Sequence, residues 1–183
     1  KDNKLLKNID GTPLIRNIVL EITKSDLDSC SIVLGYQSDK VADVIKDLNI
    51  NLILNPLWKE GQASSLKVAL NSLTSSYSDL LIMLGDLPGI KSGHINRIIE
   101  EHLSSENRRS KITIPSFKGE KGNPVIWGRS FFHDLSNLKG DVGGRALFGQ
   151  HPAAINLIEM DDPSVVTDTD TPEDFDSFIA NRA

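Results

Sequence analysis

The sequence has few of the residues that mark secreted, membrane-bound or cysteine-rich proteins. Its 183 residues include one cysteine, which excludes an internal disulfide framework and a zinc site with several cysteine ligands. The longest apolar run, Leu80–Leu84, is strand-sized and far below the roughly 20 residues that a bilayer-spanning helix needs. The first residues do not resemble a signal peptide. We therefore expect a soluble, cytoplasmic protein without a membrane partner.

Basic residues are outnumbered by acidic ones. Lysine and arginine total 20 against 25 aspartates and glutamates, which gives a net charge of −5. Sequence-independent binding to DNA or RNA needs a basic surface that replaces counterions, so we expect no nucleic-acid partner. A ligand that carries phosphate must then be held locally, by backbone amides, a few basic side chains or a divalent cation.

Short apolar runs alternate with amphipathic stretches along the chain, which is typical of an α/β domain. We predict a single doubly wound domain over residues 1–183. Thr12 and Pro13 predict a helix N-cap and the first helical residue, and an apolar stripe predicts a helix over Asp39–Leu48. Leu80–Leu84 is expected to form a strand buried on both faces. Sheets of this kind bind ligands outside the carboxyl ends of their strands, so chemistry is expected there.

The segment Gly85-Asp86-Leu87-Pro88 directly follows the most apolar predicted strand. Glycine ends the strand and Pro88 prevents its continuation, which leaves Asp86 at the carboxyl edge of the sheet. A carboxylate there can hold Mg²⁺, a hard cation that shares oxygen ligands with substrate phosphates. It can equally well hydrogen-bond its own turn, and this segment alone does not decide between the two.

The second acidic segment is Asp168-Thr169-Asp170-Thr171-Pro172-Glu173-Asp174. Its second half has a structural explanation, because Thr171 can be an N-cap, Pro172 the first helical residue and Asp174 the partner in a capping box. Capping does not explain Asp168 and Asp170, which precede the cap and repel each other without a cation. This surplus pair favours a metal site.

Three further segments have both a ligand-binding and a purely structural interpretation. The glycines of Gly140–Arg145 can expose amides to an anion, with Arg145 adding a phosphate-binding fork, although an ordinary turn is favoured. In Asn55–Leu66, Ser64 either caps the following helix or contacts a nucleobase. Asn123 either faces a second substrate or only satisfies its turn. His102 shares a predicted helix with several isoleucines and is expected at the surface or its boundary.

Taken in order, six segments resemble the MobA-like nucleotidyltransferases, and most of all their molybdenum-cofactor (molybdopterin) cytidylyltransferase branch. The matching segments are Lys4-Leu5-Leu6, Asn55–Leu66, Gly85–Pro88, Gly122–Val125, Gly140–Arg145 and Asp168–Asp174. The resemblance implies a Rossmann-like, three-layer α/β/α nucleotidyltransferase fold with a mostly parallel, mixed central sheet. One departure is that the family's opening strand and glycine-rich loop should lie just before Lys1, so we expect that segment to be missing from this sequence.

The resemblance also implies a reaction, in which a nucleoside monophosphate, CMP from CTP, is transferred to the phosphate of molybdopterin with release of pyrophosphate. A phosphomonoester is already largely dianionic at neutral pH, so no general base is required. The implied metal is Mg²⁺, and a delivery partner among molybdoenzymes or their chaperones is possible. The implied roles are Asp86 and Asp170 as metal ligands with Asp168 in reserve, Lys4 on the triphosphate, Gly61, Ser64, Ser65 and Gly85 with Asp86 on the nucleotide, and Asn123 and Arg145 on the acceptor.

Two alternatives stay open. The acceptor can be another phosphorylated compound, such as a sugar phosphate or an alcohol phosphate, and CTP is not separated from GTP or another nucleoside triphosphate. From a different class, the chain can be a non-catalytic nucleotide-binding module. Pyrophosphate release separates that module from an enzyme, and acceptor turnover separates the enzymes from one another.

Overall fold

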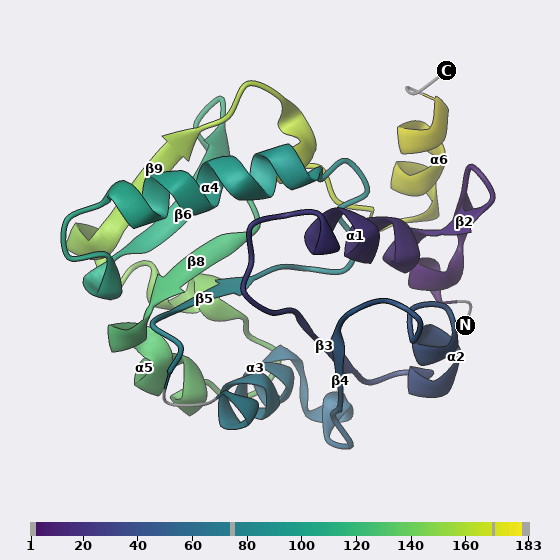
Figure 1. The fold of residues 1–183 in the computed structure, drawn as a ribbon, viewed down its shortest axis with the longest axis horizontal. Coiled ribbons are helices and arrows are strands. Elements are labelled where there is room, and N and C mark those ends of the chain that lie inside the picture. The colour runs from purple at the N-terminus through teal and green to yellow at the C-terminus, as the bar shows by residue number, and fades with distance from the viewer. Residues whose placement is uncertain (1–2, 74–75, 170, 181–183) are drawn as a thin grey trace.

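Strands and helices alternate along the chain in a computed structural model that describes residues 3–73, 76–169 and 171–180 (Figure 1). This pattern confirms the α/β class. The helices are α1 (Leu14–Thr23), α2 (Ser38–Asp43), α3 (Gln62–Ser72), α4 (Ser92–Ser104), α5 (Phe132–Asn137) and α6 (Pro172–Ala180). The strands are β1 (Asn8–Ile9), β2 (Thr12–Pro13), β3 (Ser31–Leu34), β4 (Asn51–Leu54), β5 (Asp79–Ile82), β6 (Ile112–Phe117), β7 (Glu120–Lys121), β8 (Val125–Gly128) and β9 (Ile155–Glu159). Among the described helices, none is long and apolar enough to cross a membrane.

The main sheet is mixed. Strand β8 pairs antiparallel with β5 and with β6, while β6 pairs parallel with β9 and antiparallel with β7. Strands β3 and β4 form a separate parallel pair. The register of β5 against β8 sets Ile82 opposite Val125, so the end of β5 lies beside the start of β8. This register brings the loop after β5 and the turn before β8 to one edge of the sheet.

Side chains alternate between the two faces of β8, and this alternation defines three layers. Ile126 joins a cluster that contains buried isoleucines of α1 and α4. Val125 and Trp127 face the opposite way, into a second cluster with Leu135 of α5 and Leu66 of α3. Helices therefore cover both faces of the sheet, as the predicted α/β/α arrangement requires.

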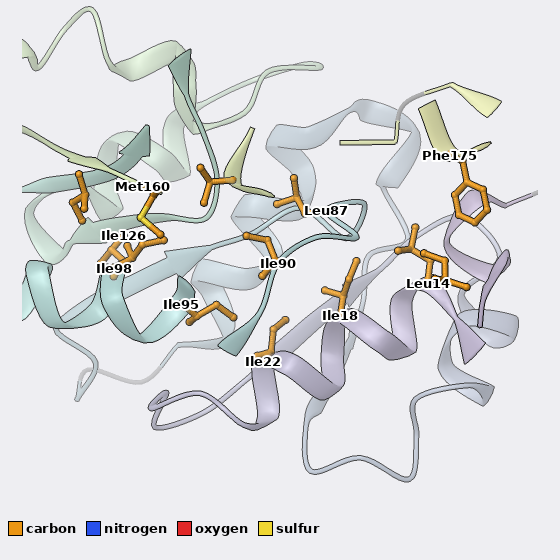
Figure 2. Packing of buried hydrophobic residues seen from close by; sticks show 13 residues of the cluster. Leu14, Ile18, Ile22, Leu87, Ile90, Ile95, Ile98, Ile126, Met160 and Phe175 are labelled. Atoms are coloured by element: carbon orange, nitrogen blue, oxygen red, sulfur yellow. The ribbon is translucent and has the colours of Figure 1, made fainter. Parts of the chain in front are cut away.

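Helix α1 forms because of its apolar stripe rather than its helix propensity. Leu14, Ile15, Ile18, Val19 and Ile22 recur on one face and are all buried, although β-branched residues are weak helix formers. Each fully buried side chain of this kind contributes roughly 1.5–3 kcal/mol. Three residues of this stripe, Leu14, Ile18 and Ile22, pack in one cluster with the residues after β5 and with α4 (Figure 2). The same cluster thus fixes both α1 and the loop that follows β5.

Three local predictions were wrong. Thr12 is not the N-cap and Pro13 is not the first helical residue, because both form β2, which pairs with β1 across an Asp10-Gly11 turn, and Pro13 itself is the N-cap of α1. The helix predicted over Asp39–Leu48 ends at Asp43, and the chain continues in tight turns that still bury Ile45. Leu80–Leu84 is not buried on both faces.

The reason for the last difference is the position of β5 in its sheet. Its residues are half-buried, and Leu84 beyond it is 38% exposed. Among the strands in the described part of the chain, β5 pairs with β8 alone. One edge of the strand is therefore open.

Candidate active site

Asp86 lies in the loop that follows β5. The next residues hold this loop in the core, since Leu87 and Ile90 are each 1% exposed and pack in the cluster of Figure 2. The side chain of Asp86 is only 15% exposed, and its Oδ2 accepts a hydrogen bond from Lys4 Nζ at 2.7 Å. Lys4 belongs to a short 3-10 helix, and the neighbouring Leu5 packs beside Gly85. Three residues predicted for the nucleotide site, Lys4, Gly85 and Asp86, are thus brought together.

The second oxygen of this carboxylate has an unusual environment. Asp86 Oδ1 is buried, and within the described residues it has no hydrogen-bond partner. Leaving a buried carboxylate oxygen unsatisfied costs free energy, and such atoms are rare in folded proteins. A divalent cation is a ligand that would satisfy this oxygen, because Mg²⁺ and Mn²⁺ prefer carboxylate oxygens. The donor atom present therefore fits the metal that the sequence implies.

The carboxy-terminal acidic segment reaches the same loop. Thr169 is 1% exposed, and its backbone N–H and its hydroxyl both donate to the carbonyl oxygen of Asp86, each at 3.2 Å. Its neighbour Asp168 is exposed and lines a shallow hollow of about 350 Å³ together with Asp174. Asp170, the other predicted metal ligand, lies outside the described residues. Within the described ranges, no group of three or more histidine, cysteine, aspartate or glutamate side chains is placed to hold a metal.

The predicted capping box at the start of α6 is present. Asp174 Oδ2 accepts from the backbone N–H of Thr171 at 2.8 Å, and the N–H of Asp174 donates to Thr171 Oγ1 at 3.1 Å. The Thr171 hydroxyl and N–H lower the pKa of Asp174 despite the opposing effect of burial, and the charge of Lys4 lowers it further. These residues are therefore explained by helix formation.

The two adjacent serines of the Asn55–Leu66 segment are hydrogen-bonded to a buried asparagine. Asn55 is 0% exposed, and its Nδ2 donates to Ser64 Oγ at 2.8 Å and to Ser65 Oγ at 3.0 Å. Ser64 Oγ also lies 2.8 Å from the Gly61 carbonyl and 3.0 Å from that of Leu57. Ser64 is the third residue of α3, so it does not cap the helix at the N-cap position.

Gly61 and the glycine-rich loop over 140–145 pack against each other. Gly61 has φ +98°, and an added Cβ would lie 2.5 Å from the Asp141 Cα atom, so only glycine fits here. The first amides of α3 are taken by this loop: Gln62 N–H donates to Asp141 Oδ1 and Ala63 N–H to the Gly140 carbonyl, both at 3.2 Å. This loop therefore supports the start of α3, in agreement with the favoured interpretation of its glycines as a turn.

The two residues predicted for the acceptor lie near one another. Asn123 precedes β8, and its N–H donates to the Val165 carbonyl at 2.7 Å. Arg145 is exposed and donates from Nη2 to the carbonyl of Lys121 at 3.0 Å, two residues from Asn123. The register of β8 with β5 places this turn at the edge of the sheet that carries Asp86.

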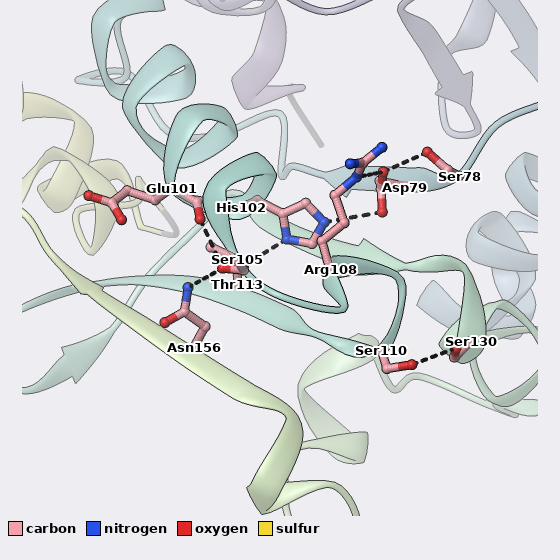
Figure 3. A network of polar contacts seen from close by, with 10 residues as sticks. All are labelled: Ser78, Asp79, Glu101, His102, Ser105, Arg108, Ser110, Thr113, Ser130 and Asn156. Atoms are coloured by element: carbon pink, nitrogen blue, oxygen red, sulfur yellow. Dashed lines mark hydrogen bonds and ion pairs between the residues drawn. The ribbon is translucent and has the colours of Figure 1, made fainter.

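A polar network at the other end of β5 was missed, because His102 was expected near the surface. His102 is 1% exposed, and its ring joins Thr113 Oγ1 at 2.8 Å to Asp79 Oδ1 at 3.1 Å (Figure 3). Asp79 Oδ2 accepts from Ser78 at 2.6 Å and from Arg108 Nε at 3.2 Å. Burial alone would raise the pKa of Asp79, but the hydrogen bonds of this network outweigh it and lower that pKa.

Several solved structures have the same fold as this chain. The structure of the Rv0371c homologue from Mycobacterium sp. strain JC1 has a TM-score of 0.83, is 24% identical, and aligns over 98% of this chain and 88% of its own. Rv0371C from Mycobacterium tuberculosis in complex with manganese has a TM-score of 0.79 at 22% identity, over 97% and 91% of the two chains. CMP:2-keto-3-deoxy-manno-octonic acid synthetase complexed with CTP has a TM-score of 0.76 at 11% identity, over 98% and 91%. This chain thus shares its fold with these three proteins.

The sequence comparisons identify the family. The model of the MobA-like NTP transferase domain matches residues 1–155, and this chain belongs to that family. The bifunctional protein GlmU of Prochlorococcus marinus (strain MIT 9211) is 25% identical over 135 residues, which are 74% of this chain and 29% of GlmU. The purine catabolism protein PucB of Bacillus subtilis (strain 168) is 30% identical over 121 residues, 64% of this chain and 56% of PucB. The chain thus spans less than two thirds of either relative.

Proposed function

We propose that this protein is a nucleotidyltransferase that moves CMP from CTP to the phosphate of a molybdopterin-type acceptor and releases pyrophosphate. The observation that carries the proposal is the buried Asp86 carboxylate, which has one oxygen on Lys4 and one without a partner within the described residues. It lies at a strand end, where α/β proteins bind their ligands. Family membership supports a nucleoside triphosphate as the donor substrate.

In this proposal Asp86 is the main metal ligand, with Asp170 as its partner and Asp168 in reserve. A bound Mg²⁺ would neutralise charge on the triphosphate and on the leaving pyrophosphate. A manganese complex of a structure with the same fold supports a divalent metal. Lys4 is 35% exposed beside Asp86, so its ammonium group can reach a phosphate without leaving this end of the sheet.

The chemical step is a displacement at the α-phosphorus. An oxygen of the acceptor phosphate forms a bond to the α-phosphorus, and the bond from that phosphorus to the bridging oxygen of pyrophosphate breaks. The attacking oxygen is already ionised at neutral pH, so the protein's contribution is alignment and charge neutralisation. Asn123 and Arg145 hold the acceptor, because the turn of Asn123 lies at the same edge of the sheet as Asp86 and the exposed guanidinium of Arg145 is hydrogen-bonded to Lys121 just before that turn.

The choice of nucleotide and acceptor rests on the sequence motifs. The segment around Gly61, Ser64 and Ser65 resembles the cytidylyltransferase branch, and a structural neighbour is complexed with CTP. A pterin acceptor implies delivery of the product to molybdoenzymes or their chaperones in the cytoplasm. A sugar phosphate or an alcohol phosphate is the second candidate acceptor. The relatives GlmU and PucB are 25% and 30% identical to this chain and carry different names, so they do not single out one acceptor.

We also propose that a strand and glycine-rich loop before Lys1 complete the nucleotide site. Among the strands of the described residues, β3 pairs with β4 alone and β5 with β8 alone, so each has an open edge with free backbone groups. A further strand would pair there and carry its loop to the edge where Asp86 lies. Adding these residues should raise nucleotide affinity at least about tenfold, as expected for several amide–phosphate contacts.

Pyrophosphate release by the full-length protein tests the proposal. CTP, GTP, UTP and ATP are each supplied with Mg²⁺ and molybdopterin. We expect that, of the four nucleotides, only CTP gives pyrophosphate release with molybdopterin. Release only when a sugar or alcohol phosphate replaces molybdopterin would establish the second candidate. Binding of a nucleotide without release for any acceptor would identify a non-catalytic module.

A further inference from the structure

We propose that Asn55 is a positioning residue that sets the polarity of the base-binding site by keeping the hydroxyl hydrogen of Ser65 available to the nucleobase. This inference rests on the proposed function, because it concerns how the same site distinguishes nucleotides. It is drawn from the hydrogen bonds of Asn55, which is 0% exposed and therefore inaccessible to a ligand itself.

The orientation of the Asn55 amide follows from its neighbours. The backbone N–H of Leu57 can only donate, and it lies 2.9 Å from Asn55 Oδ1. The atom facing Leu57 must therefore be the amide oxygen, which leaves the NH₂ group facing the serines. Its two hydrogens are directed to the oxygens of Ser64 and Ser65, at 2.8 and 3.0 Å. Both serines are thus forced to accept from Asn55.

The two serines differ in whether their hydroxyl hydrogen is already used in a hydrogen bond within the protein. The single hydroxyl hydrogen of Ser64 is used internally, because its oxygen lies 2.8 Å from the Gly61 carbonyl and 3.0 Å from the Leu57 carbonyl, which can only accept. Ser65 makes no such contact to a carbonyl within the described residues, and it is half-buried. Ser64 therefore anchors the loop, whereas Ser65 retains a hydrogen that it can donate.

This polarity has a consequence for recognition. A hydroxyl that must accept from Asn55 donates its hydrogen elsewhere, so Ser65 favours a base that presents an acceptor, such as N3 or O2 of cytosine, at that point. An aspartate at position 55 would reverse the arrangement. Its carboxylate has almost the same shape as the amide but accepts, so it would draw the Ser65 hydrogen toward itself and leave only lone pairs for the base.

The test uses full-length protein and the nucleotide that the wild type binds most tightly among CTP, GTP, UTP and ATP, each with Mg²⁺. Calorimetry gives the dissociation constants. We expect Ser65→Ala and Asn55→Asp each to weaken binding about tenfold, the size of one lost hydrogen bond to a ligand. Asn55→Ala, although a larger change in shape, should weaken it less, because Ser65 keeps its hydrogen. Ser72→Ala, at an exposed serine in the same helix, is the matched control.

The double variants decide whether Asn55 acts through Ser65. In a Ser65→Ala background, Asn55→Asp should change the affinity by less than about twofold. A full effect of Asn55→Asp in that background, or a larger loss with Asn55→Ala than with Asn55→Asp, would overturn the inference alone. If Asn55→Asp does not fold, the size of the Asn55→Ala effect decides, and a loss as large as that of Ser65→Ala would overturn the inference. A wild type that binds none of the four nucleotides would overturn the proposed function as well.

Discussion

Strand β5 has a carboxylate at each end, and the two differ in how fully they are satisfied. Asp79, its first residue, accepts hydrogen bonds from Ser78, His102 and Arg108 with both oxygens engaged. Asp86, beyond its last residue, has Lys4 on one oxygen, while the other is buried without a partner within the described residues. Both side chains are nearly equally buried, at 16% and 15% exposed.

The two carboxylates therefore differ in the number of their hydrogen-bond partners and not in their burial. A complete set of partners stabilises the fold and leaves nothing for a ligand to do. An orphaned oxygen costs stability in the free protein and is explained when a ligand supplies the missing partner. We therefore propose that Asp79 serves stability and that Asp86 serves function.

The largest effect is expected from Asp86→Asn. The amide keeps the shape of the side chain but loses the charge that holds a cation, so turnover should fall by about 100-fold or more. The free energy of unfolding should change by no more than about 1 kcal/mol, because an ion pair with a partly exposed lysine contributes little. Steady-state kinetics and urea unfolding measure the two quantities. Turnover close to that of the wild type would remove Asp86 from the metal site.

The reverse pattern is expected from Asp79→Asn. Losing charge-assisted bonds to the buried His102 and to Arg108 should lower the free energy of unfolding by about 2–3 kcal/mol and leave turnover nearly unchanged. The pKa of Asp79 is lowered in the folded state, so its stabilisation is present above about pH 4 and is lost as pH falls through the lowered pKa. The gap in stability between wild type and variant should close with acidification. A gap that is constant down to pH 2 would contradict this role.

The smallest effects are expected from two buried threonines, one near each carboxylate. Thr113→Val removes the hydroxyl that pairs with His102 and should cost about 1 kcal/mol of stability without affecting turnover. Thr169→Val removes a bond to the Asp86 carbonyl; its stability cost should be similar, but turnover should also fall a few-fold as the loop loses support. Thermal unfolding and kinetics of both variants measure this contrast. Equal turnover in the two variants would argue against it.

Features set by neighbouring residues could be predicted from the sequence. A helix start near Pro13 and the Thr171–Asp174 capping box depend on residues that are close in sequence. Asp86 was predicted at a strand end because glycine and proline surround it. The Asp10-Gly11 turn was missed although its signal, an Asp-Gly pair, is local. Both residues have positive φ, as a two-residue hairpin turn requires.

The rest depends on residues that are distant in sequence. His102 is buried beside Asp79 and Thr113, which belong to two other elements. The residues around it in α4 do not distinguish it from a histidine at the surface. Gly61 packs on Asp141, and the neighbouring Gln62 is hydrogen-bonded to Asp141, which is 79 residues away in the sequence. The orphaned oxygen of Asp86 can be recognised only when all of its neighbours are placed.

Calorimetry of nucleotide binding with and without Mg²⁺, on full-length wild type, Asp86→Asn and Asp79→Asn, tests the central claim most directly. We predict that Mg²⁺ strengthens nucleotide binding at least about tenfold in the wild type and in Asp79→Asn, and not in Asp86→Asn. The same strengthening in Asp86→Asn as in the wild type would contradict the assignment of a metal to the unpaired oxygen.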